Sequence, residues 1–133
     1  MSPNTHNGQA VQKFIIGGAN EWMEYSGVSL ADVINEDETK SSKLGGVGFG
    51  RAPKGSSTDF EFAYDEVLVV TKGSISVSSQ GKIVTMQAGE IVYLPAGIAG
   101  VFMAVSDAEF VYVASSPYGE VNRDAKASLL ATI

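Results

Sequence analysis

From Asp59 onward the sequence consists of short β-type runs that are separated by turn residues at close, even spacing. Each run alternates apolar with polar residues or is rich in Val and Ile, and Gly or Pro stands near most of the run ends. This pattern is typical of sandwiches and barrels, so we predict an all-β fold. The expected strands are Glu66–Thr71, Ser74–Ser78, Lys82–Gln87, Ile91–Leu94, Val101–Val105 and Phe110–Ala114, with a hairpin tip at Gln80–Gly81.

The segments on either side of this region are less regular. Phe14–Ile16 has the composition of a short strand, and the following stretch to Ile34 has large apolar residues at mixed spacing, so we leave it unassigned. In the glycine-rich run 45–50, Val47 and Phe49 are expected to face one side of a strand, and 51–58 is expected to be a loop. The residues 123–133 predict a short C-terminal helix with Asn122 as its cap.

The size and the missing cysteines limit the domain organisation and the chemistry. A chain of 133 residues is expected to form one domain, with a flexible tail at 1–12 and the folded domain at 13–133. With Cys 0, disulfides, thiol nucleophiles and cysteine-ligated metals are excluded. The only histidine is His6, in the tail, so we expect no imidazole ligand in the core and no cofactor.

Charge and hydropathy bear on the partners. The net charge of -6, without a cluster of Lys and Arg, disfavours nucleic acid. The sequence has no secretory signal and no apolar run of about 20 residues, so we expect no membrane partner and a cytoplasmic location. Val67–Val70, Ile91–Leu94 and Val111–Val113 are apolar at consecutive positions, which indicates strands covered on both faces. A second subunit would cover the outer face, so we predict a homodimer.

Two spaced motifs carry a resemblance to a known superfamily. Glu66 is followed after six residues by Gly73, and Gly89 is followed after five residues by Pro95, then by Gly97. Together they resemble the two motifs of the cupins, which implies a single RmlC-like jelly-roll β-barrel with an N-terminal arm and a barrel core at approximately 45–117. At the places of the usual histidine ligands this sequence has Asp59, Glu61 and Gly100, so of the four ligands the resemblance leaves only Glu66.

A narrower resemblance is to the cupin domain of the ethanolamine-utilisation EutQ family, which also lacks those histidines. The similar segments are Gly46–Phe49, Tyr64-Asp65-Glu66, Ala88–Gly97 and Phe110–Ala114, with Pro117 beyond. The resemblance implies a place in an ethanolamine-utilisation-like pathway. The long N-terminal region of full-length members has no counterpart in this sequence, so we do not expect their kinase-like roles.

Glu66 is the first candidate for chemistry, because it opens an apolar strand where ionisation of a carboxylate is costly. Its pKa is expected to be raised, and together with Tyr64 and Tyr93 it would form the catalytic set for proton transfer of a lyase or isomerase type. The alternative is a structural carboxylate that satisfies backbone donors or pairs with a cation such as Arg51. We expect the ligand-binding residues to be Asp59, Glu61, Phe49, Arg51 and Phe102.

Three functions therefore remain open. The first is a metal-free cupin that binds a small organic molecule in its barrel, with or without catalysis. The second is a non-catalytic accessory or assembly protein that acts through its dimer surface. The third is a metalloenzyme in which Asp59, Glu61 and Glu66 ligate a hard cation, although Phe60 and Phe62 could equally be the inward residues of that strand.

Overall fold

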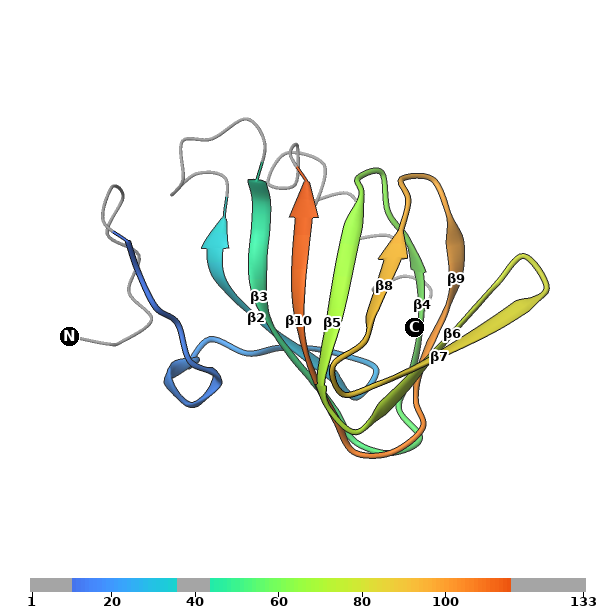
Figure 1. Ribbon diagram of the computed structural model, residues 1–133, viewed down its shortest axis with the longest axis horizontal. Coiled ribbons are helices and arrows are strands. Elements are labelled where there is room, and N and C mark those ends of the chain that lie inside the picture. The colour runs from blue at the N-terminus through green and yellow to red at the C-terminus, as the bar shows by residue number, and fades with distance from the viewer. Residues whose placement is uncertain (1–10, 36–43, 116–133) are drawn as a thin grey trace.

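The computed structural model describes residues 11–35 and 44–115, which form two antiparallel sheets facing each other across an apolar interior (Figure 1). One sheet has six strands in the order β1-β2-β3-β10-β5-β8, and the other has four in the order β4-β9-β6-β7. Most neighbours in the sheets are distant in sequence, as in a jelly roll. The strands are β1 (Met23–Tyr25), β2 (Val28–Asn35), β3 (Leu44–Ala52), β4 (Ser57–Glu61), β5 (Glu66–Lys72), β6 (Ser74–Ser79), β7 (Lys82–Gln87), β8 (Ile91–Leu94), β9 (Ala99–Ala104) and β10 (Ala108–Ser115).

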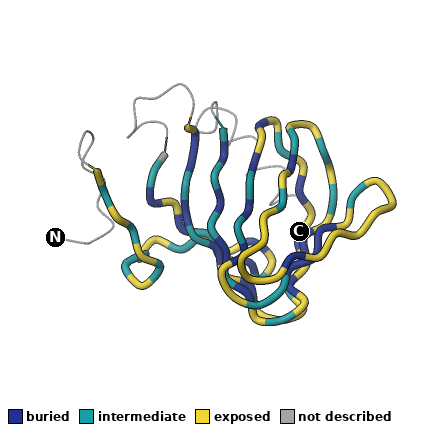
Figure 2. Tube along the Cα trace, in the orientation of Figure 1, coloured by how far each residue is buried: buried dark blue, intermediate teal, exposed yellow. Residues whose placement is uncertain are grey.

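The predicted all-β fold is confirmed, and the six predicted strands from Glu66 onward are present with shifts at their ends. The hairpin tip lies where expected, with positive φ angles of 52° at Gln80 and 75° at Gly81. In Figure 1 this β6–β7 hairpin extends away from the barrel, and Figure 2 shows that most of β7 is exposed.

Two local predictions are wrong. Phe14–Ile16 is not a strand, because the chain turns there into the short 3-10 helix η1 (Ile16–Gly18) and none of its backbone joins a sheet. The loop predicted at 51–58 is shorter, since β3 continues to Ala52 and β4 begins at Ser57. The alternation of Thr58 and Phe60 toward the interior accounts for the extra strand residues. The predicted C-terminal helix at 123–133 and its cap lie outside the described residues, as do His6 and the first ten residues.

The interior is built from alternate residues of both sheets. On the central strands the inward side chains are buried and their neighbours on the outer face are half-buried, as the alternating colours of β3, β5 and β10 show in Figure 2. The largest buried cluster contains Val28, Ala52, Phe60, Leu68, Val70, Ile75, Val77, Met86, Leu94, Phe102, Ala104, Ala108, Phe110 and Tyr112.

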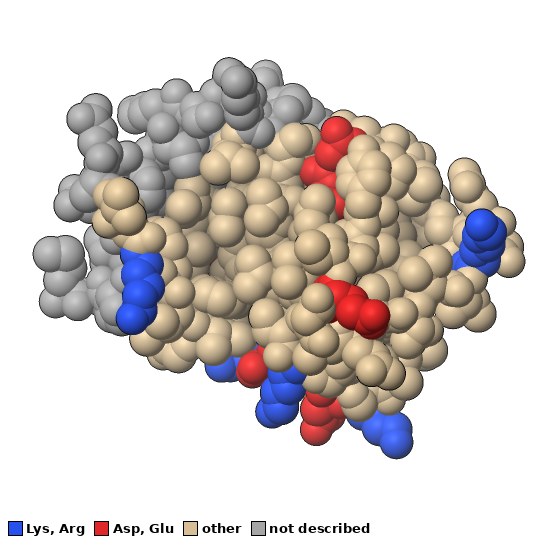
Figure 3. Space-filling view, viewed as in Figure 1, with Lys and Arg blue, Asp and Glu red and all other residues tan. Residues whose placement is uncertain are grey.

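The outer face of the six-stranded sheet is apolar as well. Here we define the outer apolar face as the adjoining outward residues of β3, β10, β5 and β8. In Figure 3 the surface over these strands is free of charge across its middle, and the charged side chains lie around its edge. Its exposed members lie on β8, where Ile91 is 64% and Tyr93 58% exposed. The face consists of Val47, Phe49, Val67, Val69, Ile91, Tyr93, Val111 and Val113.

In residues 11–35 and 44–115, no helix is long and apolar enough to cross a membrane.

Candidate functional site

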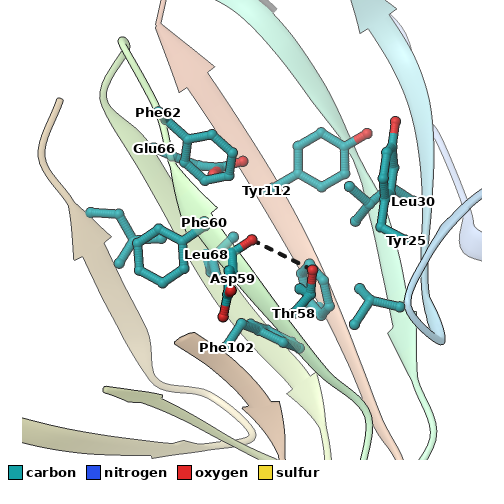
Figure 4. Close-up of a pocket in the computed structure, with 13 residues that line it drawn as sticks. Tyr25, Leu30, Thr58, Asp59, Phe60, Phe62, Glu66, Leu68, Phe102 and Tyr112 are labelled. Atoms are coloured by element: carbon teal, nitrogen blue, oxygen red, sulfur yellow. Dashed lines mark hydrogen bonds between the residues drawn. The ribbon is translucent and has the colours of Figure 1, made fainter. Parts of the chain in front are cut away.

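A pocket opens between the two sheets, with an empty volume of about 490 Å³ including its mouth (Figure 4). Its walls come from both sheets and are mostly aromatic or aliphatic. The polar groups are few, and they lie on β1, β4, β5 and β10. The lining residues are Tyr25, Val28, Leu30, Thr58, Asp59, Phe60, Phe62, Glu66, Leu68, Leu94, Phe102, Phe110 and Tyr112.

Glu66 is the buried carboxyl group of this pocket. As the first residue of β5 it pairs with Ala114 on one side and Leu94 on the other, and this register turns its side chain inward. The residue is 8% exposed. Burial, followed by the negative charge of Asp32, raises the pKa of Glu66 to about 8. Glu66 is therefore mainly protonated at neutral pH.

Asp32 is connected to the pocket by a hydrogen bond from Tyr112 that passes over Gly48. In the sheet, Asp32 of β2 lies opposite Gly48 of β3, and Gly48 lies opposite Tyr112 of β10. Because Gly48 has no side chain, the Tyr112 hydroxyl can lie over it and donate a hydrogen bond to the Asp32 carboxylate. We did not identify Asp32 from the sequence. The signal was its spacing of two from Leu30, which places both on one face once 28–35 is known to be a strand.

Two further phenols surround Glu66. Tyr25 lines the pocket at 2% exposure, and burial together with Asp32 raises its pKa. Tyr64 does not line the pocket but stacks on Phe62 at a centroid distance of 5.0 Å, and Phe62 stacks on Phe60 at 5.7 Å. Burial, then Glu66, raises the pKa of Tyr64 well above its usual range. Both phenols are thus neutral hydroxyl groups at physiological pH.

Tyr93, the third residue of the expected catalytic set, lies outside the barrel. Its hydroxyl donates a hydrogen bond to the Asp65 carboxylate at 3.1 Å, and this bond raises the pKa of Tyr93. The backbone amide of Ala96 donates to the same oxygen at 2.9 Å. Asp65 therefore ties the turn after β8 to the start of β5, and the Tyr-Asp-Glu segment has one outward and one inward carboxyl group.

The expected ligand-binding residues are divided between the two sides of the sheets. Phe102 is 6% exposed and lines the pocket. Phe49 lies on the outer apolar face, opposite Val111. Arg51 pairs with Glu109 at 3.3 Å and stacks over the Trp22 ring at 4.5 Å, so its described partners do not include Glu66.

Asp59 and Glu61 are exposed residues of β4, whereas Thr58 and Phe60 are buried. Asp59 nevertheless belongs to the lining of the pocket, and Glu61 does not. The open question of which face of this strand points inward is thus answered in favour of the Phe60 side. Asp59, Glu61 and Glu66 do not converge, and no three His, Cys, Asp or Glu side chains in the described part of the chain are close enough together to hold a metal ion.

Replacing Asp32 by Asn should lower the pKa of Glu66. The Asp32 charge disfavours the second carboxylate, so its removal should bring the Glu66 titration midpoint below about 8. The midpoint should stay above 4.5, because burial is the larger cause. The measurement is a ¹³C NMR titration of the Glu66 carboxyl carbon. The matched control is Glu61→Gln, on an exposed residue that does not line the pocket, which should leave the midpoint in place. An unchanged midpoint in Asp32→Asn would contradict the assigned coupling.

Comparison with known proteins relates this geometry to a family. A family model described as ethanolamine utilisation protein EutQ matches residues 12–118. The Escherichia coli K12 protein named acetate kinase EutQ is 28% identical over 87 residues, which are 65% of this chain and 36% of that protein. The Clostridium difficile EutQ structure superposes with a TM-score of 0.60 at 27% identity, covering 66% of this chain and 61% of that one. This chain therefore spans about a third of the first relative and about three fifths of the second.

Proteins outside this family have the same fold. An RmlC-like cupin from Shewanella frigidimarina NCIMB 400 superposes with a TM-score of 0.65 over 83% of this chain and 96% of that one, at 16% identity, which is evidence for the shared fold alone. With the family match over most of its length, the chain belongs to the EutQ family of ethanolamine utilisation proteins and has the cupin fold.

Proposed function

We propose that this protein binds a small organic molecule in the pocket between its sheets and that Glu66 exchanges a proton with it. As a carboxylate Glu66 would take a proton from a carbon of the ligand, and as the acid it would return one. The observation that carries the proposal is a carboxyl group in the wall of an apolar pocket, on a residue that is only 8% exposed. Burying such a group costs free energy unless a ligand forms hydrogen bonds with it. A carboxylic acid with a pKa near 8 is also matched to general acid and base catalysis at neutral pH.

The kinase activity in the name of the E. coli relative is not part of this proposal. Phosphoryl transfer relies on Arg, Lys or Mg²⁺ to neutralise the phosphates. The described lining of the pocket has no Lys or Arg, and it includes the Glu66 carboxyl group. The better supported alternative to catalysis is simple binding, in which the same carboxyl group only holds the ligand.

An exchange experiment tests binding and catalysis together. Small hydroxy, keto and amino compounds are screened by their effect on the ¹³C signal of the Glu66 carboxyl group. Compounds that bind are then incubated with the protein in D₂O, and ¹H NMR follows the loss of carbon-bound hydrogen. We expect wild-type protein to catalyse this exchange and Glu66→Gln, which has the same shape but no acidic proton, to lose it.

Each outcome distinguishes one function. Binding without exchange would support a binding protein and contradict the catalytic part. Exchange that persists in Glu66→Gln would exclude Glu66 as the proton donor. If no compound perturbs the Glu66 signal, the pocket is not a small-molecule site. Glu61→Gln is the control, since it removes a carboxylate from the exposed side of β4 and should behave like wild type.

We propose in addition that the outer apolar face is covered by a second copy of the chain. A partner with the same net charge of -6 is repelled by most of this protein's surface, so a contact between copies requires a patch without charge. The outer apolar face is such a patch, and Ile91 and Tyr93 are its most exposed members. Two-fold symmetry would place the same residues on both sides of the contact.

Ile91→Asp should convert the dimer to monomers. The carboxylate would be buried twice in a symmetric interface, which should raise the dissociation constant by about two orders of magnitude, corresponding to about 2.7 kcal/mol. The measurement is multi-angle light scattering on a dilution series. Ile83→Asp is the control, because Ile83 is 73% exposed but lies on β7, away from the outer apolar face. Monomeric wild-type protein, or equal masses for wild type and Ile91→Asp, would contradict the proposed contact.

A further inference from the structure

The lining of the pocket has the character of a cation site. Of its thirteen residues, six carry aromatic rings, which come from four strands and the loop after β4. The labelled rings lie around the space near Glu66 in Figure 4. The Asp32 carboxylate lies at the end of the Tyr112 side chain. No Lys, Arg or His belongs to the described lining, so no cationic side chain there would pair with Glu66 when it ionises. The rings are Tyr25, Phe60, Phe62, Phe102, Phe110 and Tyr112.

From this geometry we infer that the ligand is a small organic ammonium ion, an inference that rests on the proposed binding function of the pocket. Aromatic rings attract a cation through their negative faces, and the attraction is larger in a site shielded from water. The Glu66 carboxyl group would supply the acceptor that the ammonium group requires. An anionic ligand would oppose the ionisation of Glu66 and would meet no Lys, Arg or His among the described lining residues, and a neutral ligand would gain less than a cation from the faces of the rings.

Proton release should accompany the binding. A bound cation favours the ionised form of Glu66 and thus lowers its pKa from about 8, so the complex should lose a proton at pH 7. The titratable groups around Glu66 are Asp32 on β2, Asp59 on β4, Tyr25 on β1, Tyr64 before β5 and Tyr112 on β10. Tyr25 and Tyr64 remain neutral in this range, because their pKa values are raised above 10.

Three probes that share a propyl group test the inference: propylammonium, 1-propanol and butyrate. We expect propylammonium to bind about tenfold or more tightly than 1-propanol at pH 7.5, as ¹³C and methyl NMR titrations would measure, and butyrate to bind most weakly. The dissociation constant for propylammonium should fall as the pH rises from 6 to 8, by at most about tenfold per unit, and level off above pH 8. Glu66→Gln should weaken the binding and abolish this pH dependence.

Glu61→Gln removes a carboxylate that does not line the pocket, so it should bind propylammonium like wild type. Equal loss in both variants would show a general charge effect and overturn the inference. Tighter binding of 1-propanol or butyrate would overturn the ammonium class while leaving the proposed binding function in place. Absence of binding by all three probes would count against both proposals.

Discussion

Glu66→Gln should stabilise the folded protein at alkaline pH and have no such effect at acidic pH. The pKa of Glu66 rises from 4.5 to about 8 on folding, so below pH 4.5 the carboxyl group is protonated in both states. Between pH 4.5 and about 8 the unfolded chain ionises while the folded protein does not, and the contribution of Glu66 to stability is progressively lost. At about 1.4 kcal/mol for each pH unit, the loss approaches about 5 kcal/mol above pH 8.

Urea denaturation of wild type and Glu66→Gln at pH 4.5, 6, 7 and 8.5 would measure this effect. The gap between the two free energies of unfolding should widen in favour of Glu66→Gln with rising pH, reaching about 3 kcal/mol at pH 7. Glu61→Gln, on the exposed side of β4, is the control and should follow the wild-type curve. Parallel curves for wild type and Glu66→Gln would mean that the folded protein does not hold a protonated Glu66.

The strands after Asp59 could be predicted because the order of apolar and polar residues indicates their faces and turn residues indicate their ends. Val-rich or alternating runs end at residues such as Gly81, which adopt backbone conformations unsuited to a continuing strand. The segment 23–35 lacks this regularity. In β2 the exposed, charged Asp32 interrupts the apolar residues, and a register shift follows between Asp32 and Ile34. Asp32 therefore breaks the apolar pattern from which the strand β2 could have been predicted.

The candidate site was only partly predictable for a related reason. Glu66 could be found, because a carboxylate at the start of an apolar strand is locally unusual. The orientation of β4 could not be decided from alternation, which allows either Asp59 and Glu61 or Phe60 inside. The fold buries Phe60, because burying two carboxylates without cations would cost more than burying an aromatic ring. The Tyr112–Asp32 bond joins residues 80 apart in the chain, so no local pattern indicates it.

Glycines on β3 set the width of the pocket, and Gly50 allows the sharpest test of this. In the sheet Gly50 lies between Leu30 of β2 and Phe110 of β10, and the Phe110 ring lies directly over it. A Cβ at position 50 would overlap three atoms of that ring, which is buried against Phe102 at a centroid distance of 5.4 Å. We therefore expect Gly50→Ala to lower the free energy of unfolding by about 3 kcal/mol, the upper part of the range for overpacked cores.

A double-mutant cycle separates this overlap from a general loss of strand stability. Phe110→Leu removes the ring atoms that the new Cβ would meet, so Gly50→Ala should cost little in that background, and the coupling energy should be about 2 kcal/mol. Gly17→Ala is the matched control, because a Cβ there meets nothing within 4 Å and its stability should match wild type. Strictly additive effects of Gly50→Ala and Phe110→Leu in urea denaturation would contradict the packing argument. Coupling would show that β3 needs glycine at position 50 to make room for the Phe110 ring. That ring forms part of the wall of the pocket that contains Glu66.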